Sequence, residues 1–141
     1  MFADLIARLE AAVEPSRDLD VAIWAAIGYP GVVGTKPTAY RLGTAEKLNG
    51  EVALTWPGNP RCGHHDLGQV RRYTASLDAA LTLVPEGADV EVYFSPREKP
   101  HRRGCVVLTI SRQVYEAHAA TLALALCIAA LRARAADGGP R

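Results

Sequence analysis

The sequence predicts an α+β fold, with helices near both ends of the chain and a small, mainly antiparallel sheet. Apolar side chains recur at helical spacing near the N-terminus, two strand-like stretches follow in residues 89–110, and an alanine- and leucine-rich segment comes last. The chain has 141 residues, of which 49% are apolar, so one domain with its own core is expected. We assign this domain to residues 1–135 and expect residues 136–141 to form a flexible tail.

The N-terminal region predicts two consecutive helices. Apolar residues within 2–14 share one helical face, and Pro15 ends that helix. Ser16 is a suitable N-cap for a second helix, whose apolar stripe continues to Ile27 before Gly28 ends it. An N-terminal αα-hairpin is therefore expected.

Residues 29–73 show the weakest periodicity, because glycine and proline interrupt it repeatedly. One strand is expected at residues 51–56 and a shorter one at residues 40–42. The remainder is interpreted either as functional loops, the parts of a fold in which function most often varies, or as a β-meander whose strands the pattern does not reveal.

The segments that follow, from residue 74 to residue 110, show clearer secondary-structure patterns. A short helix is expected at residues 77–84, with Thr74 or Ser76 as its N-cap. Residues 89–94 alternate between polar and apolar and predict a half-exposed strand, whereas residues 104–110 are more continuously apolar and predict its buried antiparallel neighbour. The polar residues between them form the connection.

The last part of the chain predicts a long Ala/Leu helix within residues 112–135. Its apolar residues do not share one face, so it is either a central helix covered on several sides or an interface between subunits. Its most apolar stretch, residues 122–131, has about half the length that a membrane span needs. Residues 1–14 lack a basic start followed by an apolar run, so we expect a cytoplasmic protein with no membrane partner.

Three stretches resemble a known family: RYTASLDAALTLVPEG at residues 72–87, ATLALALCIAALRAR at residues 120–134, and the opening residues 5–12 with 18–23. They are similar to the phage ABA sandwich domain family. The resemblance implies a three-layer α/β/α sandwich of bacteriophage or prophage origin, and it implies no activity and no catalytic residues. Relatives have proline at the position of Leu122, and without that fixed start we expect the helix to continue unbroken from Gln113.

One loop carries residue types that bind zinc: Cys62, His64, His65 and Asp66. No paired-cysteine or helical histidine spacing accompanies them, so a fourth ligand would have to come from His101, Cys105 or His118. This loop is the basis of one alternative function, a metal-dependent hydrolase. If it is only a polar loop, no cofactor is expected.

The three cysteines fit reduced thiols better than a disulfide framework. Cys105 and Cys127 lie in apolar stretches and are interpreted as small core residues. Cys62 follows Arg61 in a loop, which makes it the least implausible nucleophile of the three.

A net charge of +1 hides an uneven distribution. Residues 1–30 carry two basic and five acidic side chains, residues 76–95 carry none and four, and residues 96–116 carry five and two. The basic residues within 96–116 form either a solvated turn or a cationic site for a phosphate, a nucleotide or a nucleic-acid backbone. Tyr73, Tyr93 and Tyr115 could stack on a base, although their places in expected strands and helices favour core packing. The candidate ligand-binding residues are Arg71, Arg72, Arg97, Lys99, His101, Arg102 and Arg103.

The chain has no P-loop, no GxGxxG, no HExxH and no recognisable catalytic triad. We therefore expect a non-catalytic binding protein, whose partner is a host protein or a small anionic ligand and whose role includes counter-defence. The near-neutral total charge makes nucleic acid the less favoured partner. A homo-oligomeric structural component, assembled through the C-terminal helix, is the second alternative.

Overall fold

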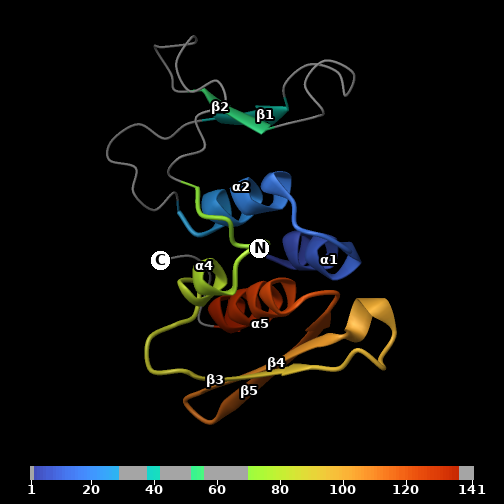
Figure 1. The fold of residues 1–141 in the computed structure, drawn as a ribbon. Helices are drawn as coiled ribbons and strands as arrows, with labels where there is room; N and C mark the ends of the chain where they lie inside the picture. Colours follow the sequence, from blue (N-terminus) through green and yellow to red (C-terminus); the bar gives the residue numbers. More distant parts are fainter. Residues whose placement is uncertain (1, 29–37, 42–51, 56–69, 137–141) are drawn as a thin grey trace.

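The structure is a computed structural model that describes residues 2–28, 38–41, 52–55 and 70–136. The helices are α1 (Ala3–Ala11), α2 (Arg17–Ala26), α4 (Leu77–Leu81) and α5 (Leu122–Ala136), with a 3-10 turn η1 (Pro100–Arg102). The strands are β1 (Thr38–Arg41), β2 (Val52–Thr55), β3 (Asp89–Phe94), β4 (Gly104–Ile110) and β5 (Gln113–Ala119). Strands β3, β4 and β5 form an antiparallel sheet in that order, and β1 pairs separately with β2 (Figure 1). The predicted mixture of helices and a small antiparallel sheet is confirmed.

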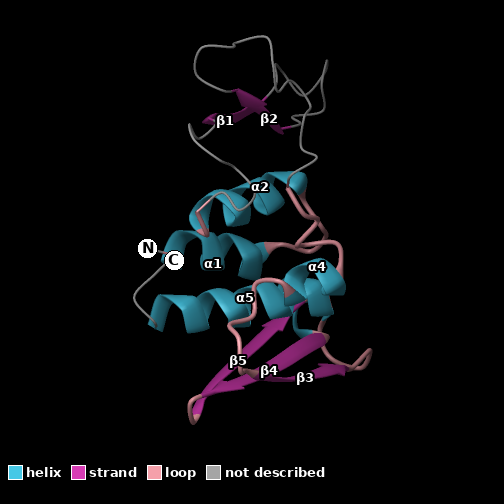
Figure 2. Ribbon diagram, turned by 90° about the vertical axis from the view of Figure 1, so that its left-hand side faces the viewer, coloured by secondary structure: helices cyan, strands magenta, loops and turns pink. Residues whose placement is uncertain are grey.

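The described helices lie on one face of the three-stranded sheet (Figures 1 and 2). Helix α5 packs directly on β4 and β5, α1 and α4 pack against α5, and α2 packs on α1. Figure 2 shows the sheet at the bottom, α4 and α5 above it, and α1 with α2 above those. The opposite face of the sheet, which we call the outer face, is not covered by any of residues 70–136 or by the described helices.

The predicted αα-hairpin is confirmed, with α1 ending three residues earlier than expected. The Ser16 hydroxyl oxygen accepts a hydrogen bond from the Leu19 backbone N–H at 3.3 Å and caps α2 as predicted. Trp24 on α2 and Leu9 on α1 are fully buried. Burial of such large apolar side chains is the main term that holds the two helices on the rest of the domain.

The prediction of one unbroken helix from Gln113 is wrong. Residues 113–119 form strand β5, which follows β4 through a two-residue turn at Ser111 and Arg112. Both turn residues have positive φ, 51° and 69°, which is the backbone of a type I′ hairpin turn. The Thr121 hydroxyl then accepts from the Leu124 backbone N–H at 3.2 Å and starts α5 without a proline.

Helix α5 is central, as one of the two readings of its sequence predicted. Nearly all of its residues from 123 to 133 are buried, because β4, β5, α1 and α4 of the same chain surround it. At its start the helix approaches the sheet so closely that a side chain on Gly104 would lie 2.6 Å from the Thr121 carbonyl carbon. None of the described helices is long and apolar enough to cross a membrane.

A buried carboxylate ties the segment before α4 to helix α2. Asp20 is 1% exposed, and its Oδ1 accepts from the Thr74 backbone N–H at 2.8 Å and from the Thr74 hydroxyl at 2.7 Å. Its Oδ2 lies 2.8 Å from Nη1 of Arg17, which also donates to the Arg71 carbonyl. Asp20 lies in the first turn of α2, where a carboxylate also suits the helix dipole, and both of its carboxylate oxygens have hydrogen-bond partners.

Candidate functional site

Five of the seven candidate ligand-binding residues lie in the connection between β3 and β4, which we call the basic turn (residues 95–103). The Ser95 backbone N–H donates to the Arg103 carbonyl at 2.9 Å, and the Arg102 N–H donates to the Lys99 carbonyl at 2.8 Å. These hydrogen bonds fix the backbone, so its charged side chains project from an ordered scaffold. Arg103 is half-buried and its Nε donates to the Glu98 carbonyl at 3.4 Å.

Most cations of the basic turn are exposed and have no acidic partner in the described residues. Arg97, Lys99 and Arg102 are exposed. The ion pairs seen in residues 70–136 and the N-terminal helices involve other residues, such as Arg132 with Glu10 at 3.1 Å. His101 is exposed as well. Unneutralised guanidinium and ammonium groups that share one short turn attract anions.

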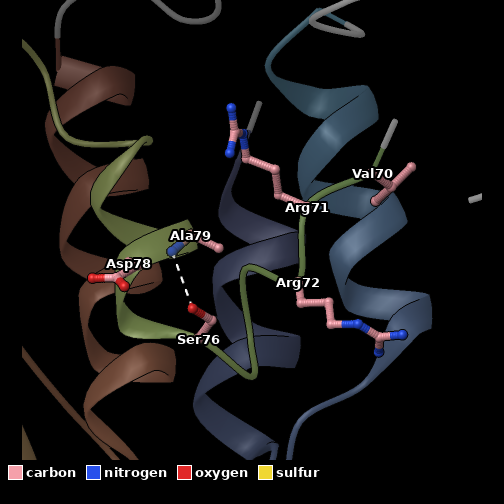
Figure 3. Close-up of a pocket in the computed structure, with 6 residues that line it drawn as sticks. All are labelled: Val70, Arg71, Arg72, Ser76, Asp78 and Ala79. Carbon is pink, nitrogen blue, oxygen red and sulfur yellow. Dashed lines mark hydrogen bonds between the residues drawn. The ribbon is translucent and has the colours of Figure 1, made fainter. Parts of the chain in front are cut away.

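Arg71 and Arg72 do not join this group. They lie on the segment that leads into α4, which Figure 1 shows apart from the connection between β3 and β4. Both line an open depression of about 410 Å³, and Figure 3 shows their guanidinium groups pointing in different directions. Asp78 of α4 also lines the depression, so an acidic side chain accompanies the two arginines there.

The proposed zinc ligands Cys62, His64, His65 and Asp66 lie outside the described residues. Of the three side chains considered as their fourth ligand, His101 is on the basic turn. The other two, Cys105 and His118, are opposite each other in the β4–β5 register and lie on the outer face of the sheet. There they meet a third residue, Glu116, which the sequence reasoning did not single out.

The three side chains form a compact cluster, which we call the outer-face cluster (Cys105, Glu116 and His118). The Cys105 Sγ lies 3.8 Å from Glu116 Oε1 and 3.9 Å from His118 Nε2, and His118 Nε2 lies 3.2 Å from the same Glu116 oxygen. One potential ligand atom from each residue lies within 4.8 Å of the others. Glu116 is exposed, and the other two residues are half-buried.

Protonation of the cluster follows from its partners. His118 Nδ1 is buried and has no hydrogen-bond partner among the described residues. An N–H at Nδ1 would be buried without an acceptor, so the tautomer with its proton on Nε2, directed at Glu116, is the one that leaves no buried donor unpaired. Desolvation raises the pKa of the Cys105 thiol, the Glu116 carboxylate raises it further, and Arg102 of the basic turn partly opposes both. The thiol is therefore neutral at pH 7.

The interpretation of Cys105 as a core residue is wrong, and that of Cys127 is confirmed. Cys127 is fully buried in α5 and its thiol donates to the Tyr73 carbonyl at 3.3 Å. Cys105 points to the opposite side of β4 from the buried Val106. A Glu-x-His pattern places both side chains on one face only in a strand, so predicting a helix over residues 116–118 concealed the cluster.

Scans of the chain against family models, curated proteins and solved structures each found no match.

Proposed function

We propose that this chain is a small, non-catalytic binding protein that captures a mononucleotide or a similar phosphorylated ligand on the basic turn. The observation that carries the proposal is the set of three exposed cations, Arg97, Lys99 and Arg102, that lack acidic partners in the described residues on a turn with a hydrogen-bonded backbone. Guanidinium groups bind phosphate oxygens with charge-assisted hydrogen bonds, and a fixed backbone reduces the entropy lost on binding.

Two exposed aromatic rings beside the turn favour a ligand that carries a base as well as a phosphate. Tyr93 is 53% exposed and Phe94 is 55% exposed at the end of β3, just before the basic turn. They are consecutive strand residues and point to opposite faces, Tyr93 to the outer face beside Cys105 and Phe94 to the inner face, so one ring at a time could stack on a base. An exposed aromatic ring next to a cationic turn offers a ligand an apolar face beside positive charge. Aromatic faces stack on nucleobases, whereas inorganic phosphate would gain nothing from them.

The resemblance of three stretches to phage ABA sandwich domains supports a phage or prophage origin as part of this proposal. Under it, the protein acts in the host cytoplasm as an accessory factor, and sequestering a nucleotide signal would serve counter-defence. The three-layer α/β/α arrangement also belongs to the proposal.

Nucleotide titration of the full chain by isothermal calorimetry tests the proposal. ATP, ADP and the corresponding guanine nucleotides are compared with inorganic phosphate at low and high salt. The double charge reversal R97E/R102E should weaken nucleotide binding at least tenfold, and binding should weaken with salt because the contacts are electrostatic.

The matched control is R71E/R72E, which changes the net charge by the same amount at the depression between α2 and α4. This variant should bind the nucleotide as the unmodified chain does. Equal affinity of R97E/R102E and the unmodified chain, or equal loss in both variants, would contradict binding at the basic turn.

A further inference from the structure

We propose that Cys105, Glu116 and His118 form a zinc-binding site on the outer face of the three-stranded sheet. The proposal concerns a different site from the residues that bind a nucleotide in the proposed function, and it stands if that function fails. It also differs from the zinc loop expected from the sequence. Cys105 and His118 are suggested there only as alternatives for a fourth ligand.

The spacing of the three ligand atoms matches tetrahedral zinc. Ordinary zinc–ligand bonds at tetrahedral angles would separate sulfur from either of the other atoms by about 3.6 Å and nitrogen from oxygen by about 3.4 Å. The corresponding separations here are 3.8 and 3.9 Å for sulfur and 3.2 Å for nitrogen and oxygen. Shifts of a few tenths of an ångström would therefore complete the coordination without moving either strand.

The backbone holds these atoms in place. Cys105 and His118 are direct partners in the β4–β5 ladder, and Glu116 lies two residues before His118 on the same strand. Side chains two residues apart on a strand project from the same face. Three ligands from two hydrogen-bonded strands give a site that exists before the metal arrives, which limits the ordering cost of binding.

The ligand types select the metal. A thiolate with an imidazole suits zinc and disfavours magnesium and calcium, which prefer oxygen ligands. A thiolate and a carboxylate together balance the charge of a divalent cation. Three protein ligands leave the fourth position to a water or a bound molecule, and the described part of the chain leaves that side of the sheet open.

Hydrogen bonding alone is the competing explanation, because the thiol and the imidazole can each donate to Glu116. The surroundings of the His118 ring also limit the zinc affinity that we expect. With zinc on His118 Nε2, the ring proton moves to Nδ1, which has no acceptor among the described residues. Loss of such a supporting hydrogen bond costs 10- to 100-fold in metal affinity, so we expect weaker binding than in a closed four-ligand site.

Zinc and cobalt titrations of the full chain, stripped of metal with a chelator and then freed of it, test the site. We expect one equivalent of zinc to bind in competition with a chromophoric chelator. Cobalt should give a sulfur-to-metal charge-transfer band and the visible spectrum of tetrahedral coordination. C105S should abolish that band, and C105S, E116Q and H118Q should each lower the zinc affinity at least tenfold.

The matched control is C62S/H64Q/H65Q, which removes three of the four candidate ligands of the other loop and should leave both titrations unchanged. Circular dichroism checks that every variant is folded, and E116Q alters an exposed side chain with the smallest risk to folding. Absence of a charge-transfer band in the unmodified chain would overturn the proposal. So would loss of binding in the control triple variant, or unchanged zinc affinity in C105S and H118Q.

Discussion

The two faces of the β3–β4–β5 sheet are built from the same strands and differ in almost every other respect. On the inner face, Val106 and Leu108 of β4 and Ala117 of β5 are at most 1% exposed and lie under α5. On the outer face, Cys105 and His118 are half-buried and Glu116 is exposed. Residues that alternate along one strand thus meet different demands, because successive side chains point to opposite sides. Side chains on the inner face pack under α5, whereas side chains on the outer face remain accessible to ligands or metal ions.

The largest expected difference concerns the two described thiols. Iodoacetamide should label Cys127 at least 1000-fold more slowly than Cys105 in metal-free protein, read peptide by peptide by mass spectrometry. Cys127 is fully buried, its thiol donates to the Tyr73 carbonyl, and burial raises its pKa, so labelling requires unfolding. Similar rates for both cysteines in folded protein would show that α5 is not enclosed as described.

Truncation of one apolar side chain on each face gives the next largest contrast. Leu108→Ala should lower the free energy of unfolding by about 3 kcal/mol, because Leu108 is fully buried and a cavity would remain under α5. Val107→Ala, one residue earlier on the half-buried outer face, should cost less than about 1 kcal/mol. Urea unfolding measures both, and equal losses would mean that both faces of β4 are packed.

Gly104 tests how closely the inner face approaches the start of α5. Gly104→Ala should destabilise the protein by about 2 kcal/mol, since the added methyl would meet the backbone of Thr121 and Leu122 rather than a flexible side chain. Urea unfolding reads the loss. A neutral effect would contradict the close approach of β4 to the helix.

The smallest effect is a gain in stability at the turn between β4 and β5. Arg112 has φ of 69°, which glycine adopts without the steric penalty of a side chain. Arg112→Gly should therefore raise the free energy of unfolding by about 1 kcal/mol. Arg112→Ala retains a β-carbon and should give no such gain, so equal stabilisation by both would exclude relief of backbone strain.

Local patterns predicted most of the elements. The serine caps and apolar spacing predicted α2 and α4, and the alternation of Asp89 to Phe94 predicted β3. No local pattern signals strand β5, because Ser111 and Arg112 lack the asparagine and glycine that usually mark a type I′ turn. With no turn signal, the alanines of residues 117–120 were assigned to the helix that follows them.

Of the two candidate sites, one could be predicted from the sequence and the other could not. The cations of the basic turn are neighbours in sequence, so composition alone could group them. The outer-face cluster joins Cys105 to residues 11 and 13 positions later, and no local motif spans that separation. Only the β4–β5 register brings these side chains together.

The sequence by itself determined the positions of α1, α2, α4, β3 and β4, the charge of the basic turn and the apolar character of α5, since each depends on residues close along the chain. The tertiary structure decided that residues 113–119 pair with β4, that Asp20 and Thr74 join across 54 residues, and that Cys105 faces Glu116 and His118. These outcomes depend on which distant segments satisfy one another's backbone hydrogen bonds and apolar faces, and local propensity carries no information about that choice.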